Sequence, residues 1–174
     1  MSQIDQQTDK PKTVMAFGTF DLFHAGHENY LKQAKELGDE LIVIIARDET
    51  VKKIKGQAPV QNENQRHKSV KMSGYADKVV LGFKGDKHKV LKKFRPDVIA
   101  LGYDQFVFTQ RLEKTLIDLR LDATIIRLQP YCPQMYKSSL LKNSAQTTPD
   151  VIASEVTASG SKAISFSGLG NKVL

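Results

Sequence analysis

The chain has 174 residues and a mass of 19.5 kDa, which allows one domain of ordinary size but not two independent hydrophobic cores. Hydrophobic residues make up 40% and charged residues 26% of the chain. No run approaches the roughly 18 apolar residues of a membrane span, so the composition excludes a transmembrane protein. The polar N-terminus lacks the apolar stretch of a secretory signal, and the single Cys132 cannot form an internal disulfide. We therefore expect a cytoplasmic protein that does not bind membranes.

The net charge of +7 comes from one stretch of the chain. Residues 47–93 carry 13 basic and 5 acidic side chains, a net charge of +8, and the remainder carries −1. Such a cluster attracts nucleic acid, nucleotides or phosphorylated metabolites, although basic side chains on a solvated helix surface give the same composition. A nucleic-acid-binding module built on this stretch would need aromatic side chains interleaved with the lysines, or an RNA-binding signature, and the stretch has only Tyr75 and Phe83. We therefore expect no nucleic-acid partner.

The composition also changes near both ends. Residues 1–11 show no apolar periodicity and are expected to form a disordered lead-in. Of the 32 residues from 143 to 174, 16 are Ser, Thr, Ala or Gly, too poor in large apolar groups to build a core, so we expect a flexible low-complexity tail. The single folded domain is therefore expected over residues 12–142.

Within that domain, short apolar runs alternate with segments of helical periodicity. The first run, residues 14–17, is followed by apolar residues at helical spacing from Tyr30 to Leu37, and Gly38 suits the C′ position of that helix. Further strands are expected at residues 41–46, 78–81, 98–101 and 124–128, and further helices at 63–73, 86–94 and 110–119. This alternation predicts an α/β fold with a doubly wound, five-stranded parallel sheet, whose ligands bind at the carboxyl ends of the strands.

The segment between the first strand and the first helix reads GTFDLFHAGH, residues 18–27. A helix N-terminus offers free backbone N–H groups and partial positive charge, and His24 and His27 would add donors to the same anion, so the pattern favours a phosphate site. Gly18 and Gly26 permit close approach of backbone and ligand. Two alternatives stay open. One is a metal site, although no third ligand stands at typical zinc spacing, and the other is a pair of histidines that only cap or pack around the helix start.

Residues 18–27 resemble the GTFDxxHxGH signature of the HxGH nucleotidyltransferase superfamily, and the positions that match are Gly18, Thr19, Phe20, Asp21, His24, Gly26 and His27. The resemblance covers about residues 12–142 and includes ARDETVKKIKG at 46–56 and LGYDQ at 101–105. It implies a Rossmann-like fold and transfer of a nucleotidyl group from a nucleoside triphosphate to a phosphorylated acceptor, with Mg²⁺ and release of pyrophosphate. It also implies a homodimer.

The resemblance assigns roles residue by residue. It implies that His24, His27 and Lys55 are catalytic, the histidines stabilising the triphosphate and the transition state. It places Thr19 and Asp21 beside the α-phosphate or its magnesium ion. The remaining nucleotide-binding positions that it implies are Gly18, Phe20, Gly26, Lys53 and Arg66, together with Asp104 beside the nucleoside and the Ser138–Ser139 pair at the β- and γ-phosphates.

The sequence departs from the family pattern at one point. The arginine that often precedes the serine motif is absent, and YCPQMYK, residues 131–137, stands there instead. Cys132 is not required as a nucleophile, because an acceptor phosphate monoester has a second pKa of about 6 and is already largely dianionic at neutral pH. The reaction needs two anions held in line and the developing charge neutralised.

Within the superfamily, the closest resemblance is to archaeal-type FAD synthetases, which transfer AMP from ATP to FMN. It rests on residues 46–56, on GYDQ at 102–105, and on Cys132-Pro followed by Ser138-Ser139. The alternative is glycerol-3-phosphate cytidylyltransferase, which uses CTP and glycerol 3-phosphate at the same HxGH site. A noncatalytic nucleotide- or nucleic-acid-binding module is a more distant alternative, and the intact His24, His27 and Lys55 argue against it.

Overall fold

A computed structural model of the chain describes residues 10–84 and 89–131. Five strands form a single, fully parallel sheet in the order β3-β2-β1-β4-β5. Their bounds are β1 (Thr13–Gly18), β2 (Glu40–Ile45), β3 (Lys78–Leu81), β4 (Val98–Leu101) and β5 (Thr124–Arg127). The predicted α/β class and all five predicted strands are confirmed. The expected lead-in, except for its last two residues, and the expected tail lie outside the described residues.

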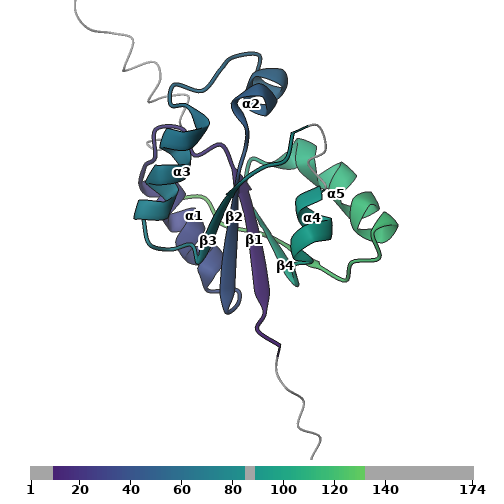
Figure 1. Cartoon of the computed structure of the whole chain (residues 1–174). Helices are drawn as coiled ribbons and strands as arrows, with labels where there is room; N and C mark the ends of the chain where they lie inside the picture. Colours follow the sequence, from purple (N-terminus) through teal and green to yellow (C-terminus); the bar gives the residue numbers. More distant parts are fainter. Residues whose placement is uncertain (1–9, 85–88, 132–174) are drawn as a thin grey trace, which may run out of the picture.

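Helices cover both faces of the sheet (Figure 1). On one face lie α1 (Ala25–Lys35) and α3 (Glu63–Met72), and on the other lie α4 (Lys89–Phe94) and α5 (Phe106–Asp118). Because side chains alternate along a strand, Val14 and Ala16 pack beneath α1 and α3, whereas Met15 packs beneath α4 and α5. Burial on both faces explains why the strands read as unbroken apolar runs. None of the helices in the described ranges is long and apolar enough to cross a membrane.

The strand order reverses at β1, and this reversal decides where a ligand can bind. β1 lies between β2 and β4, and the crossovers that leave these neighbours run on opposite faces of the sheet. Pairing of β1 with β2 continues to Gly18 and Ile45, whereas pairing of β1 with β4 ends earlier, at Ala16 and Ala100. The sheet therefore opens between the carboxyl ends of β1 and β4, where the GTFDLFHAGH segment begins.

One helix was not predicted from the sequence. The lysine-bearing segment, for which the apolar periodicity predicted neither helix nor strand, forms α2 (Asp48–Lys55), which ends at Gly56 with φ 74°. Within α2 only Val51 is buried, so the segment lacks the apolar periodicity that identifies a longer helix. Figure 1 shows α2 beyond the carboxyl ends of the strands, which places Lys53 and Lys55 at the edge of the sheet where the site lies.

The role of Gly38 differs from the one expected. It lacks the positive φ of a C′ glycine, and α1 already ends at a C-cap on Glu36. A Cβ atom on Gly38 would instead lie 2.6 Å from the Lys12 carbonyl oxygen and 2.8 Å from Cγ2 of Val14. The glycine is needed because the turn between α1 and β2 passes directly against the start of β1.

We expect Gly38→Ala to lower the free energy of unfolding by about 1–3 kcal/mol, because neither the backbone oxygen nor a core valine can move without strain. The measurement is urea denaturation. Gly82→Ala is the matched control, since its Cβ would lie 3.5 Å from the nearest atom, the Ile45 carbonyl oxygen. Equal stability of the Gly38→Ala variant and the wild type would show that the turn relaxes freely.

Candidate active site

His24 caps the helix that follows the signature segment. Its backbone is extended, with φ −144° and ψ 170°, and its Nδ1 accepts a hydrogen bond of 3.1 Å from the backbone N–H of Gly26. A ring nitrogen that accepts a hydrogen bond carries no proton, so the neutral imidazole holds its proton on Nε2. His24 thus satisfies one free amide of the helix start. The capping alternative raised from the sequence is correct for Nδ1.

His27 lies directly against His24. The two rings stack with centroids 3.8 Å apart, and Phe20 and Phe23 lie 5.3 Å and 5.6 Å from the His27 ring. Burial, together with the charges of His24 and Lys55 and against the opposing effect of Asp21, lowers the pKa of His27 to about 3. At neutral pH both rings are therefore uncharged. Nδ1 of His27 is a buried polar atom without a hydrogen-bond partner among the described residues, next to the rings of Phe20 and Phe23.

The signature segment has a strained backbone. Phe20 and Leu22 adopt positive φ angles of 54° and 50°, a conformation that costs on the order of 1 kcal/mol for each side chain with a Cβ atom. The strain turns the Phe20 ring across Gly18, where a Cβ atom would lie 2.6 Å from the ring. Phe20 is only 2% exposed, and its ring packs in the core and against His27. Its expected place among the nucleotide-binding residues stays a prediction.

Asp21 anchors the segment that precedes α3. Its two carboxylate oxygens accept hydrogen bonds of 2.9 Å from the backbone N–H groups of Val60 and Gln61, and the side chain is 2% exposed. Among residues 10–84 and 89–131, no three His, Cys, Asp or Glu side chains are grouped so that they could hold a metal ion. These residues do not fit a resident magnesium site, and Asp21, expected beside the ion, is committed to the backbone.

Arg66 is the second expected nucleotide ligand that has another role. Its guanidinium is 0% exposed and donates to three backbone carbonyl oxygens and one carboxylate. The acceptors are the carbonyl oxygens of Thr19 at 2.5 Å, Gln61 at 3.0 Å and Ala46 at 2.8 Å, and Oδ1 of Asp48 at 2.6 Å. Arg66 therefore joins the signature segment to the loops around α2. Its expected contact with a nucleotide stays a prediction.

Sequence reasoning missed two acidic residues, Asp48 and Glu63, whose reciprocal hydrogen bonds join α2 to α3. Asp48 accepts the backbone N–H of Glu63, and Glu63 accepts the backbone N–H of Asp48, both at 3.1 Å. Each acid thus caps the other helix, and Arg47 holds Glu63 through a 2.6 Å ion pair. The position of an acid in the first turn of each helix is the signal that could have revealed this arrangement.

Two expected residues flank the histidine pair. Lys55 lies near enough for its charge to lower the pKa of His27. Asp104 is exposed in the turn after β4, and its charge raises the pKa of Tyr30. Tyr30 also lies close to the histidine side of the site, with its ring centroid 6.1 Å from that of Phe20. The structure therefore brings Lys55 within electrostatic reach of His27, and Asp104 within electrostatic reach of Tyr30.

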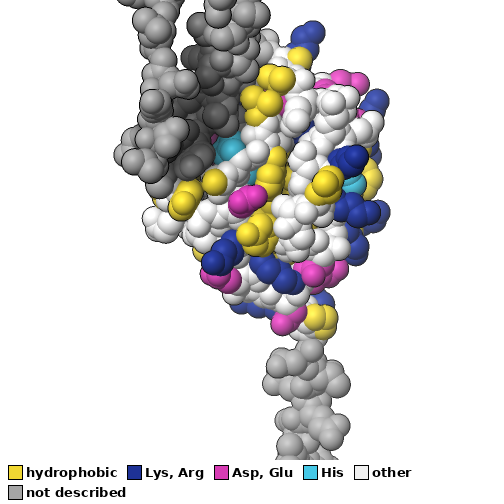
Figure 2. All heavy atoms as spheres, turned by 90° about the vertical axis from the view of Figure 1, so that its left-hand side faces the viewer, with side chains coloured by type: hydrophobic (Ala, Val, Ile, Leu, Met, Phe, Trp, Pro, Cys, Tyr) yellow, Lys and Arg dark blue, Asp and Glu magenta, His cyan; other side chains and the backbone are white. Residues whose placement is uncertain are grey.

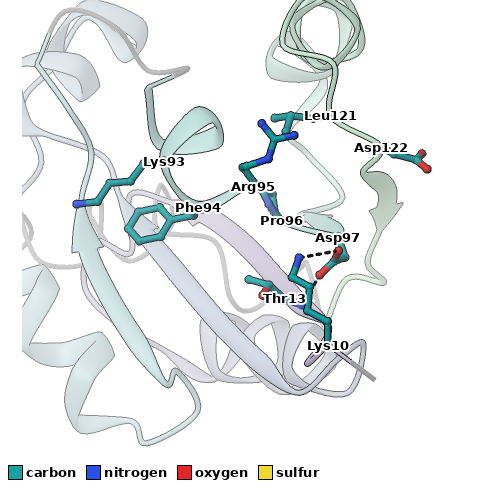
Figure 3. A pocket seen from close by; sticks show the side chains of 9 residues that line it. All are labelled: Lys10, Thr13, Lys93, Phe94, Arg95, Pro96, Asp97, Leu121 and Asp122. Atoms are coloured by element: carbon teal, nitrogen blue, oxygen red, sulfur yellow. Dashed lines mark hydrogen bonds and ion pairs between the residues drawn. The ribbon is translucent and has the colours of Figure 1, made fainter. Parts of the chain in front are cut away.

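The remaining expectations and the pocket of Figure 3 lie elsewhere. Lys53 is exposed on α2, and Ser138 and Ser139 are outside the described residues.

The pocket in Figure 3 is at the other end of the strands, where β1 begins. It is lined by Lys10, Thr13, Lys93, Phe94, Arg95, Pro96, Asp97, Leu121 and Asp122. Thr13 opens β1, about 16 Å along the strand from Gly18 at roughly 3.3 Å per residue, so this pocket is not part of the histidine site. Figure 2 shows acidic and basic side chains interspersed on the face of α1 and α3.

Comparison with known proteins agrees with the geometry. A family model described as "Cytidylyltransferase-like" matches residues 15–155. A protein from Pyrococcus horikoshii named FAD synthase is 44% identical over 138 residues, which cover 79% of this chain and 90% of that protein. The FAD synthase of Methanothermus fervidus is 47% identical over 120 residues, covering 67% of this chain and 82% of the relative. The crystal structure of a lipopolysaccharide core biosynthesis protein from Thermoplasma volcanium superposes with a TM-score of 0.66 at 38% identity, covering 70% of this chain and 99% of that structure.

The lowered pKa of His27 predicts acid sensitivity. The native state keeps His27 neutral down to about pH 3, whereas the unfolded chain binds a proton near pH 6.5. Stability contributed by this group is therefore complete above pH 6.5 and is lost as pH falls towards 3. We expect the unliganded protein to lose about 1–2 kcal/mol between pH 7 and pH 5 through this histidine.

The measurement is denaturant unfolding at both pH values for the wild type and for His27→Gln, which does not titrate in this range. The variant should show a clearly smaller difference between pH 7 and pH 5. The same loss in both proteins would place the acid sensitivity in other groups.

Proposed function

The chain belongs to the cytidylyltransferase-like family, and on this basis we propose that it transfers AMP from ATP to FMN, giving FAD and pyrophosphate. It is a nucleotidyltransferase, as the resemblance around residues 18–27 implies. FMN as the acceptor is supported by the relatives named FAD synthase, which match over most of their own length. The observation that carries the proposal is the neutral, stacked His24–His27 pair at the start of α1, in the opening between β1 and β4.

The reaction joins an FMN phosphate oxygen to the α-phosphorus of ATP. The bond from that phosphorus to the bridging oxygen breaks, and its electron pair leaves with pyrophosphate. The FMN phosphate needs no general base because it is already largely dianionic. The protein must therefore align two anions and stabilise the charge that grows on the leaving group.

The histidine pair suits that task because it can donate without carrying charge beforehand. Nδ1 of His24 accepts from Gly26, so the neutral ring carries its donor N–H on Nε2. Two imidazolium rings 3.8 Å apart would repel each other, so a neutral pair becomes charged only when a polyanion compensates it. Lys55 and the helix N-terminus add positive potential at the same place. Magnesium enters with the triphosphate as part of the substrate, consistent with the lack of a protein-built cage among the described residues.

The proposed acceptor and nucleotide are tested together in a substrate matrix. ATP and CTP are each combined with FMN and with glycerol 3-phosphate in the presence of Mg²⁺, and pyrophosphate release is measured. We expect turnover with ATP and FMN. Turnover only with CTP and glycerol 3-phosphate would overturn the acceptor and nucleotide and leave the transfer reaction intact.

We expect His24→Ala and His27→Ala each to lower kcat by about 10²–10³, or roughly 3–4 kcal/mol, with a much smaller change in nucleotide affinity. The ground-state triphosphate keeps its other donors, whereas the leaving group loses its own. The two losses should not add, because both donors act on the same phosphates. The measurements are steady-state kinetics and a melting curve for each variant.

His67→Ala is the matched control. His67 lies on α3 and its Nε2 is 3.1 Å from the Val79 carbonyl oxygen, away from the pair. It should keep a kcat near that of the wild type. Normal turnover with early melting in the His24 and His27 variants would reduce the pair to a structural role.

A further inference from the structure

At the carboxyl ends of β1 and β4, side chains rather than backbone pairing hold the two strands together. Backbone pairing between them ends at Ala16 and Ala100. If the register continued, the Phe17 carbonyl oxygen would accept the backbone N–H of Gly102. It accepts Nε2 of Gln105 instead, at 2.8 Å. Past the last rung, the two strands are therefore held at a separation set by a side chain.

The hydroxyl group of Tyr30 lies at the same rung. Its oxygen is 2.9 Å from the Ala100 carbonyl oxygen, to which it donates, and it accepts the Phe17 N–H at 3.3 Å. The Phe17 carbonyl oxygen lies 3.3 Å from the same hydroxyl oxygen. One phenol oxygen thus contacts backbone groups of both strands at the point where they part.

These contacts connect the two sides of the site. Tyr30 lies on α1, one turn after His27, so its hydroxyl group fixes the distance from the histidine-bearing helix to both strands. Gln105 follows Asp104 in the turn after β4, and its amide ties that turn to Phe17 of β1. Phe17 is the residue that both side chains contact.

Building on the proposed transfer reaction, we propose that Tyr30 and Gln105 are positioning residues, which set the gap between the histidine pair and the Asp104 turn and so align the triphosphate with its acceptor. Neither residue needs to touch the substrate. The phenol group is suited to this role because it is buried, which raises its pKa and keeps the hydroxyl protonated as a donor at neutral pH. A neutral donor in this place holds the strands without adding charge beside the phosphates.

Tyr30→Phe tests the hydroxyl group alone, because the ring and its packing remain. We expect kcat to fall by about 10-fold, since small misplacements of reacting groups cost rate more than binding. The KM for the nucleotide should stay within about twofold. The assay temperature is chosen where circular dichroism shows the variant fully folded. Tyr75→Phe is the matched control, because Tyr75 is also a partly buried tyrosine that packs against the same core.

Gln105→Leu gives a second and independent test. It removes the amide from Phe17 at nearly constant volume, and we expect the same loss of kcat. Because both side chains act on one residue of β1, the double variant should lose little more than the worse single variant. A kcat within twofold of the wild type for Tyr30→Phe, or losses that multiply in the double variant, would overturn the proposal.

Each variant is assayed with the substrate pair that the wild type uses. A wrong acceptor assignment would therefore show in the wild type, before any variant is measured. A failure of the positioning role would show only as normal turnover in the Tyr30 and Gln105 variants.

Discussion

The buried guanidinium of Arg66 is the interaction on which the architecture of the site depends. Removing a charge from water costs several kcal/mol, and this charge is offset by three carbonyl oxygens and the carboxylate of Asp48. The acceptors come from the segment after β1, the end of β2, the start of α2 and the residues before α3. One planar set of donors therefore joins four segments of the chain. Together with the reciprocal caps of Asp48 and Glu63, it holds α2 and its lysines beside the signature segment.

The signature segment depends on that support because it is strained. Two residues with side chains, Phe20 and Leu22, are held at positive φ. Asp21, between them, accepts two backbone N–H groups from the segment before α3. In this backbone conformation the Phe20 ring packs against His27, and burial of His27 keeps its imidazole neutral.

The two sides of the opening are built differently. On the side of α1, a helix N-terminus and two stacked rings offer donors to an anion. On the side of β4, an exposed carboxylate follows the strand, and the neighbouring Gln105 ties this turn back to β1. Positive potential therefore lies at the start of α1, and a negative charge follows β4. Such an arrangement suits a ligand with a polyphosphate at one end and hydroxyl or amino groups at the other.

The sequence alone determined the strand–helix alternation, the parallel sheet and the location of the site, because apolar periodicity and the GTFDLFHAGH segment are local features. It also paired His24 with His27, whose spacing around a helix start brings them together in any fold. The sequence could not decide which groups each side chain of the site contacts. Arg66, Asp21 and Phe20 stand at positions that match the family. In the structure Arg66 and Asp21 bind backbone groups, and Phe20 packs in the core. Their partners, such as Ala46, Gln61 and Gly18, lie on other segments, and only tertiary packing determines which acceptors reach a buried group. The same holds for Tyr30 and Gln105, whose meeting at Phe17 depends on where two strands part and is not encoded by any local pattern.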